Sequence, residues 1–264
     1  MAIATHSWKR KIAEQTSLLQ PGDRIRRQID GVEMLLNMEH RARVLDLGCG
    51  SGCQTLELAR RQYRVIGVDE STKARASARD QARAEQLTVH FLSHDMRSLS
   101  YDDEFNVVVN IRNPIGCYPQ EKDDAACLAA AAKALKHGGR LFLDLLNREW
   151  VMRRLSRVAH GDKSGQAFDL RSGRLDCSGF RTRGKRVDAL GRSLRLYTLT
   201  EVLHLTQAAG LTFRRVYGDY DGRSYGVDSL RMIVIAEKVK VAAPPKGRLR
   251  DGLERALRIK GRPR

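Results

Sequence analysis

The residues best suited to chemistry form one short run early in the chain. The run reads V-L-D-L-G-C-G-S-G from Val44, and it places Asp46 inside an apolar strand pattern before three glycines, Gly48, Gly50 and Gly52. Residues 54–61 then follow a helical pattern. A strand, a glycine turn and a helix amino end can hold a carboxylate or another anion on backbone N–H groups. Glycine allows the tight turn and the close approach to a ligand.

The glycine spacing distinguishes two classes of nucleotide site. The dinucleotide fingerprint is G-x-G-x-x-G, but here the third glycine comes one residue early, and Cys53 stands where that fingerprint has glycine. An acid within the strand is also foreign to that fingerprint. The run instead resembles motif I of the class I S-adenosylmethionine-dependent methyltransferases. In that family the acid and the glycine loop meet the amino-acid end of the cofactor.

Further strand patterns follow in the order that this resemblance implies. Residues 64–68 form an apolar run that ends at Asp69, near the roughly 20-residue offset of a carboxylate that binds ribose hydroxyls. Residues 89–92 predict a third strand, and the family places an acid against the adenine amine just after it, here Asp95. Later strands are expected at residues 105–109, ending in Asn110, and at residues 140–145, 211–217 and 230–236.

The expected fold is α/β, a Rossmann-like seven-stranded methyltransferase sheet with helices on both faces. By the resemblance, strand seven is antiparallel. Short strand patterns around glycine turns predict a small antiparallel insertion before strand six. The expected division is residues 1–40 as N-terminal helices or a lid, with Trp8 as a lid candidate, and residues 41–237 as the methyltransferase domain. Residues 148–197 are the basic antiparallel insertion within it, and residues 238–264 are a basic tail.

The resemblance assigns cofactor contacts around S-adenosyl-L-methionine, which we expect the chain to bind. Asp46 would attract the ammonium, and Asp69 would accept from the ribose hydroxyls. The glycines would leave room for the methionine portion, and the backbone at Cys49 would bind it. The full expected set comprises Asp46, Gly48, Cys49, Gly50, Gly52, Asp69, Glu70, Asp95, Met96 and Asn110.

A narrower bacterial subgroup of this family carries D-x-x-N-R-E after the fifth strand and Y-G-D-[YF]-D-G further on. Here these motifs begin at Asp144 and Tyr217, and the resemblance covers roughly residues 20–238. The loop after strand four departs from the subgroup, because it contains Asn113-Pro114, which is only faintly similar to the [DNS]-P-P-[YF] motif of amino methyltransferases. The second proline and the aromatic residue of that motif are absent, so a turn shaped by proline is the favoured interpretation of the pair. The resemblance to this subgroup does not identify the substrate of this chain.

Acceptor-site residues are expected on the carboxyl edge of the sheet, where open α/β folds bind ligands. Candidates for a catalytic base are Asp219, Tyr118 and His94. Each also has a simpler interpretation as a turn residue, a pocket wall or a solvated loop residue. The candidates for substrate binding are Arg112, Asn113, Asn147, Arg148, Tyr217, Tyr220 and Arg223.

The distribution of charge along the chain does not decide which class of substrate it binds. The net charge is +17, with +8 in residues 148–195 and +8 in residues 238–264, so the expected cofactor domain is close to neutral. One hypothesis is methyl transfer to an oxygen or nitrogen of a small molecule. The alternative is an RNA methyltransferase whose insertion and tail hold phosphates. A third is a cofactor-binding module without catalysis.

Composition narrows the cellular setting. The five cysteines have neither zinc-site nor disulfide spacing, which fits a reducing cytoplasm. The polar N-terminus lacks a signal-peptide pattern, and no apolar run approaches the roughly 20 residues of a membrane span. We therefore expect a cytoplasmic enzyme with no membrane span and no metal. Nothing in the sequence determines the oligomeric state.

Overall fold

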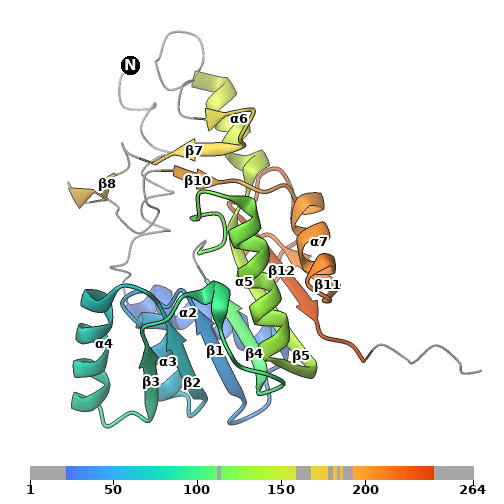
Figure 1. Cartoon of the computed structure of the whole chain (residues 1–264). Coiled ribbons are helices and arrows are strands. Elements are labelled where there is room, and N and C mark those ends of the chain that lie inside the picture. Colours follow the sequence, from blue (N-terminus) through green and yellow to red (C-terminus); the bar gives the residue numbers. More distant parts are fainter. Residues whose placement is uncertain are drawn as a thin grey trace, which may run out of the picture.

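A seven-stranded sheet forms the centre of the protein (Figure 1). The computed structural model describes residues 22–111, 114–158, 168–177, 181–182, 185–186 and 193–240. The strand order is β11-β12-β5-β4-β1-β2-β3. The strands are β1 Arg43–Leu47, β2 Arg64–Val68, β3 Val89–Leu92, β4 Phe105–Asn110, β5 Leu135–Leu146, β11 Thr212–Tyr217 and β12 Arg231–Glu237.

Strand directions confirm the expected topology. β1 pairs in parallel with β2 and β4, β2 with β3, and β4 with β5. Only β12 runs against its neighbours, β5 and β11, so strand seven of this sheet is antiparallel. The central strands are apolar on both faces, as helix-covered parallel sheets require.

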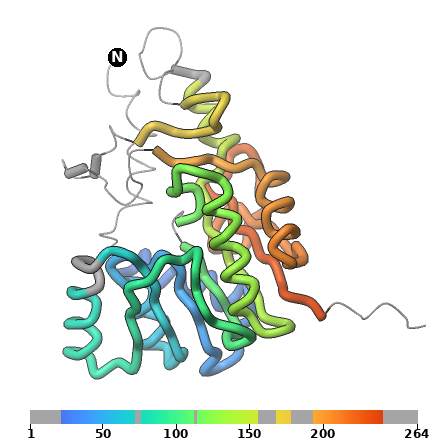
Figure 2. The backbone as a smooth tube through the Cα atoms, in the orientation of Figure 1, coloured from blue at the N-terminus to red at the C-terminus, as the bar shows by residue number. Residues whose placement is uncertain are grey.

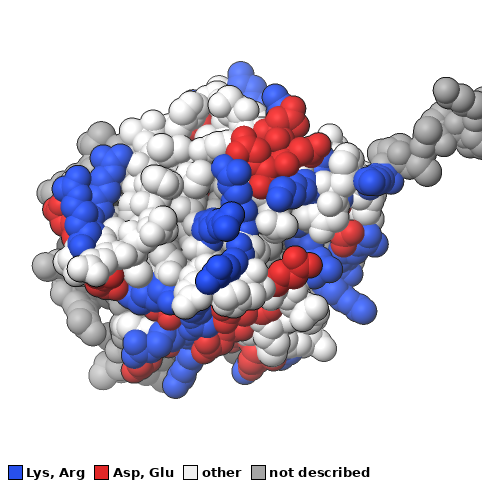
Figure 3. Space-filling model, turned by 90° about the horizontal axis from the view of Figure 1, so that it is seen from below, with Lys and Arg blue, Asp and Glu red and all other residues white. Residues whose placement is uncertain are grey.

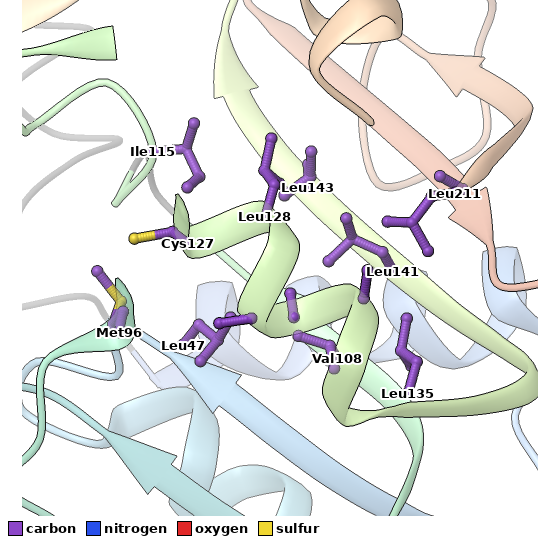
Figure 4. Close-up of a cluster of buried hydrophobic side chains, with 14 of the residues drawn as sticks. Leu47, Met96, Val108, Ile115, Cys127, Leu128, Leu135, Leu141, Leu143 and Leu211 are labelled. Carbon is purple, nitrogen blue, oxygen red and sulfur yellow. The ribbon is translucent and has the colours of Figure 1, made fainter. Parts of the chain in front are cut away.

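Helices cover both faces of the sheet. α2 (Gly22–Leu36) and α3 (Cys53–Arg60) pack on one face, and α5 (Glu121–Ala134) and α7 (Leu199–Ala208) pack on the other. Figure 4 shows the core under α5, in which Leu128 of α5, Val108 of β4 and Leu141 and Leu143 of β5 come together. α4 (Thr72–Ala84) lies beside β3. The buried residues of α2 repeat at helical spacing, as the sequence predicted for this segment.

The junction of α5 and β5 differs from the sequence prediction. In the sequence, an alanine-rich run over residues 123–135 followed by Lys136-His137-Gly138 predicts a helix with Gly138 as its cap. In the structure, α5 ends at Ala134 and β5 starts at once. The reason is a distant partner: the Gly138 N–H donates to the Lys238 carbonyl (2.7 Å), and the Lys238 N–H donates to the Gly139 carbonyl (3.0 Å). The glycine pair therefore extends the ladder between β5 and the end of β12.

The expected insertion contains a helix as well as strands. α6 (Arg148–Val158) follows β5 directly, so the antiparallel part is shorter than residues 148–197. Its elements are β6 Phe168–Asp169, β7 Arg174–Asp176 and β10 Ser193–Arg195, which form one sheet, and the pair β8 Arg181–Thr182 and β9 Lys185–Arg186. The sheet of β6, β7 and β10, called the roof below, lies above the carboxyl ends of the central strands (Figures 1 and 2).

Candidate cofactor and acceptor site

The glycine turn after β1 is bound to β2. Its three glycines adopt the left-handed conformation, with φ of 73°, 55° and 73° for Gly48, Gly50 and Gly52. The N–H groups of Gly48 and Cys49 donate to the Val68 carbonyl (2.8 and 3.1 Å). The Gly50 N–H donates to Oδ2 of Asp69 (2.9 Å). The expected backbone donor at Cys49 is thus used inside the protein, and the amino end of α3 supplies the donors for an anion.

Two of the glycines allow close approach of protein rather than ligand. A Cβ at Gly48 would lie 2.5 Å from the Pro114 ring, and a Cβ at Gly52 would lie 2.7 Å from Ala78 and Phe91. These positions were expected to leave room for the methionine portion of the cofactor. Instead, Pro114 holds the loop after β4 against the turn, and Ala78 brings α4 against it.

Asp69 is oriented at the carboxyl end of β2. Its Oδ2 accepts from the Gly50 N–H, and its Oδ1 accepts from the Ser71 N–H (2.8 Å). The side chain is partly exposed. Because a carboxylate oxygen has two lone pairs, both oxygens retain capacity for a hydroxyl donor. Glu70 beside it is exposed.

Asp46 lies beneath the turn. Its carboxylate is 2% exposed and accepts from the Thr55 hydroxyl (2.6 Å). The contact joins β1 to the first turn of α3, so Asp46 positions the glycine turn from below. Thr55 was not among the expected site residues, although its place nine residues after Asp46, on the helix that the glycine turn opens, was a usable signal.

The segment after β3 forms a short helix, η1 (Met96–Ser98), capped by Asp95. Asp95 accepts from the N–H and the guanidinium of Arg97, and this pairing lowers the pKa of the Asp95 carboxyl. Arg97 also pairs with Asp123 on α5 (2.9 Å). The exposed His94 ring contacts the Asp95 carbonyl (2.9 Å), and Met96 is buried. Asp95 therefore lies at the expected edge, already bound to an arginine.

The loop after β4 is fixed by Asn110. This buried amide donates to the Leu47 carbonyl (3.0 Å) and accepts from the Ile115 N–H (3.4 Å). It therefore connects the ends of β1 and β4 rather than facing solvent. Arg112 and Asn113, both expected to bind substrate, lie outside the described residues.

The roof is bound to that same loop. Arg174 of β7 donates to the carbonyls of Tyr118 (3.0 Å) and Gly116 (3.4 Å), and the Arg195 N–H donates to the Gly116 carbonyl (2.8 Å). From the other side, buried Asp124 of α5 accepts from the Gly116 N–H (2.8 Å) and the Tyr197 hydroxyl (2.7 Å). The loop after β4 is therefore held between the insertion and α5. Arg174 could not be singled out from local patterns, because its partners are backbone carbonyls far away in the chain.

We expect Arg174→Gln to raise the acceptor KM roughly ten-fold with an unchanged dissociation constant for the cofactor. The reason is that hydrogen bonds from a charged donor are worth about 1.5–3 kcal/mol, and these hold the loop but not the glycine turn. Steady-state kinetics and calorimetry check this together. Arg171→Gln, an exposed position at the start of the same turn, is the control. Equal KM values for the two variants would contradict the role of Arg174.

The end of β5 is capped by Asn147. Its Oδ1 accepts from the N–H groups of Glu149 (3.0 Å) and Trp150 (3.4 Å), and its Nδ2 donates to the carbonyls of Gly226 (2.9 Å) and Ser229 (2.7 Å). Asn147 is fully buried, so it starts α6 and binds the loop between β11 and β12. The sequence analysis had placed it against substrate.

Arg148 lies over Phe168 of the roof, 5.4 Å from the ring centre, and 3.6 Å from Glu201 of α7. It therefore connects α6 to the roof and to α7. Like Asn147, Arg148 holds structural elements of the site together. Its expected contact with substrate stays a prediction.

Tyr220 has a buried partner instead of the expected substrate. Its hydroxyl donates to Oδ2 of Asp144 on β5 (2.6 Å), and Oδ1 of Asp144 lies 3.2 Å from the Arg231 guanidinium of β12. Asp144 and Arg231 are 0% and 2% exposed. The Tyr220 backbone also packs against Gly31, where a Cβ would come within 2.4 Å. This network fixes the loop after β11 against α2 and β5.

Of the remaining expected residues, Arg223 and Asp219 line a cavity and Tyr217 does not. Tyr217 ends β11 and bridges to Ser224, and Arg223 pairs with Asp221. The cavity has a volume of about 790 Å³ between α6 and the loop 219–230. Its lining includes Asp219, Arg223, Trp150 and Arg154. Of the three candidate bases, only Asp219 lines this cavity, and His94 and Tyr118 lie near η1 and α5.

Comparison with known proteins agrees with this geometry. The family described as "Methyltransferase domain" matches residues 44–139. The chain is 30% identical over 211 residues to a cypemycin N-terminal methyltransferase of Streptomyces, covering 74% of this chain and 82% of that protein. It is 31% identical over 131 residues to a ubiquinone biosynthesis O-methyltransferase of Cereibacter sphaeroides, covering 45% of this chain and 51% of the relative. The chain thus spans about half the length of that second relative.

Solved structures share the fold. A methyltransferase from Clostridium acetobutylicum superposes with a TM-score of 0.64 at 16% identity, covering 81% of this chain and 92% of the other. The CcbJ methyltransferase from Streptomyces caelestis gives 0.66 at 17%, covering 88% and 99%. Fold and site together define a Rossmann-like methyl-transfer enzyme. The chain belongs to the class I S-adenosylmethionine-dependent methyltransferases, and its cofactor is S-adenosyl-L-methionine.

The residues present fit that cofactor. Asp69 offers carboxylate oxygens beside the glycine turn, where ribose hydroxyls need acceptors. The amino end of α3 suits the methionine carboxylate. Asp95 lies further along the same edge. Its carboxylate suits the adenine amine if it accepts from that amine as well as from Arg97. No group of three or more metal-ligating residues occurs within the described ranges, and none of their helices is long and apolar enough to cross a membrane.

Proposed function

We propose that the enzyme transfers the methyl group to an oxygen or nitrogen atom of a small-molecule acceptor. Support comes from the relatives, whose names include an N-terminal methyltransferase and O-methyltransferases. The observation that carries the proposal is that two arginines of the roof already have partners within the protein. Arg174 is bound to loop carbonyls, and Arg195 is paired with Glu201 (2.7 Å) and Glu121 (3.4 Å). These charges are engaged inside the protein and not presented to phosphates.

The far side of the molecule gives the RNA alternative little support. Figure 3 views the protein from below, and both signs of charge are interspersed on that face. A polyanion binder needs a coherent basic stripe or patch. Most of the residues that carry the excess charge of the tail, from residue 241 onward, lie outside the described residues.

The mechanism rests on positioning. When bound, S-adenosylmethionine supplies a methyl group on a sulfonium, which is already an activated electrophile. Asp69 and the amino end of α3 would hold the two ends of the cofactor, and Asn110 fixes the adjoining loop. Holding two reactants in a reactive geometry is worth on the order of 7–11 kcal/mol. The roof would exclude water above them.

Tyr118 is expected to act as a wall and not as a base. Burial, together with neighbouring Cys127, raises the pKa of its phenol far above the ordinary value. The phenol therefore stays protonated throughout the neutral range. We expect Tyr118→Phe to keep kcat within about threefold of wild type and to leave the pH profile unchanged, because no ionisation of this group contributes. A loss of the alkaline limb in the pH–rate profile of the variant would contradict this.

A labelled-methyl screen tests the proposed function. Cell extract separated into small molecules and RNA is incubated with enzyme and isotopically labelled cofactor, and both fractions are analysed by mass spectrometry. Label is expected in the small-molecule fraction, and a chain truncated after Lys238 should transfer it equally well. Label confined to RNA, together with RNA binding that falls steeply with salt, would favour the alternative.

A further inference from the structure

Arg97 lies at the edge of the sheet where the cofactor is expected, and it contacts three other side chains. Its Nε donates to both carboxylate oxygens of Asp95 (2.9 Å each), and its Nη2 donates to Oδ2 of Asp95 (2.7 Å). Its Nη1 donates to Asp123 in the first turn of α5 (2.9 Å). Its guanidinium carbon lies 5.0 Å from the centre of the Tyr118 ring. A partly exposed side chain is thus held by three partners from different elements.

Asp95, the main partner of Arg97, lies beside the glycine turn. Met96, the next residue, is buried, and its sulfur would lie 3.4 Å from a Cβ at Gly48. The Asp69 N–H donates to the Leu92 carbonyl (3.2 Å), which joins the carboxyl ends of β2 and β3. The carboxylate expected to bind the ribose and the carboxylate expected to bind the adenine amine therefore follow adjacent strands, on the two sides of the same turn.

The hydrogen bonds of Asp95 leave capacity for one further donor. The carboxylate accepts from three N–H groups of Arg97, which are its backbone N–H (2.9 Å), its Nε and its Nη2. An ionised carboxylate offers about four acceptor sites in all. The hydrogen bonds from Arg97 also lower the pKa of the Asp95 carboxyl, so the group stays ionised and accepts without donating. An amine hydrogen suits the remaining site.

Arg97 controls the orientation of this carboxylate. Within the described part of the chain, the side chain of Asp95 accepts hydrogen bonds from Arg97 alone. The backbone N–H binds Oδ1, and the last torsion of an aspartate has a broad energy minimum, so this bond by itself would let the second oxygen turn. The guanidinium fork binds both oxygens, and Asp123 and Tyr118 hold the fork in place.

We propose that Arg97 is a positioning residue that gives the enzyme its specificity for adenine, because it fixes the Asp95 carboxylate in the orientation that accepts from the adenine amine. The inference concerns the cofactor and goes beyond the proposed function, so it holds for any methyl acceptor. A base without the amine would leave one acceptor site of a partly buried carboxylate unsatisfied. A site built to bind a hydrogen-bond donor rejects an analogue that lacks this donor.

Binding of two ligands to the full chain tests the proposal. Isothermal calorimetry compares S-adenosylhomocysteine with its deamino analogue, in which unsubstituted purine replaces adenine. The wild-type chain is expected to bind S-adenosylhomocysteine at least about tenfold more tightly, and Arg97→Met should lower this ratio to below about threefold. The loss in the variant should affect S-adenosylhomocysteine and not the analogue. A wild-type ratio near one, or an unchanged ratio in Arg97→Met, overturns the proposal.

The deamino analogue separates positioning from a merely structural role. A variant that only loosened η1 or α5 would bind both ligands more weakly and keep the wild-type ratio, which would overturn the proposal. Arg97→Lys keeps a positive charge but loses the planar fork, so its ratio should lie between those of Arg97→Met and wild type. Arg83→Met removes an exposed arginine that lies 3.8 Å from Asp80, and it should keep the wild-type ratio. Because no methyl acceptor is present, failure of this inference would leave the proposed function intact.

Discussion

Replacing Asp69 with alanine is expected to weaken S-adenosylmethionine binding by about 1.5–3 kcal/mol, or roughly 10- to 150-fold. A hydrogen bond to a charged acceptor has this value, and Asp69 would accept from ribose hydroxyls. The substitution also leaves the Gly50 and Ser71 N–H groups without their present acceptor, which loosens the glycine turn. Isothermal calorimetry with purified protein measures the change directly.

Two further variants separate charge from folding in that experiment. Asp69→Asn keeps one oxygen that can accept from a backbone N–H, so its loss of affinity should be smaller than that of the alanine variant. Asp80→Ala removes a carboxylate that is 76% exposed and lies 3.8 Å from Arg83, and it should bind like wild type. Wild-type affinity in Asp69→Ala would remove the carboxylate from the cofactor site.

Arg231→Met alone is expected to destabilise the fold by about 3–5 kcal/mol, because it leaves the buried Asp144 charge without its partner. Replacing the network as a whole, with Asp144→Leu, Arg231→Met and Tyr220→Phe together, should recover most of that loss. The triple variant removes both buried charges and the hydroxyl of this network together, so none of the three is left without the other two.

Urea unfolding followed by circular dichroism measures both free energies. The comparison is between the single and the triple variant, since a simple packing defect would grow with the number of substitutions. A triple variant less stable than Arg231→Met would contradict the idea that the lone charge causes the loss. Arg214→Met, which breaks an exposed pair with Glu237 (3.0 Å), should change stability by less than about 1 kcal/mol.

Local patterns predicted the sheet well because its central strands are buried on both faces. Apolar runs such as residues 64–68 and 105–109 report that burial directly, and the glycine turn and Asp69 follow from their spacing. The one helix described in residues 1–40, α2, was predicted by its apolar repeat for the same reason. Trp8, in the remainder of that segment, lies outside the described residues.

Residues with distant partners were harder to interpret. Asn147 and Tyr220 stand in motifs at the acceptor edge, but their partners are Gly226, Ser229 and Asp144, more than 70 positions away in sequence. The Gly138 turn was assigned to a helix cap because its partner, Lys238, is 100 residues further on. The net charge was also a poor guide to the surface, because it does not show which arginines already form ion pairs within the protein.

A crystal structure with S-adenosylhomocysteine tests the central claim most directly. The nucleoside is expected across the carboxyl ends of β1 and β2, with its ribose hydroxyls on Asp69 and its carboxylate at the amino end of α3. The Asp95–Arg97 pair should adjust to admit the adenine amine. Density for the ligand at any other part of the molecule, with no contact between its ribose and Asp69, would contradict the assignment of the site.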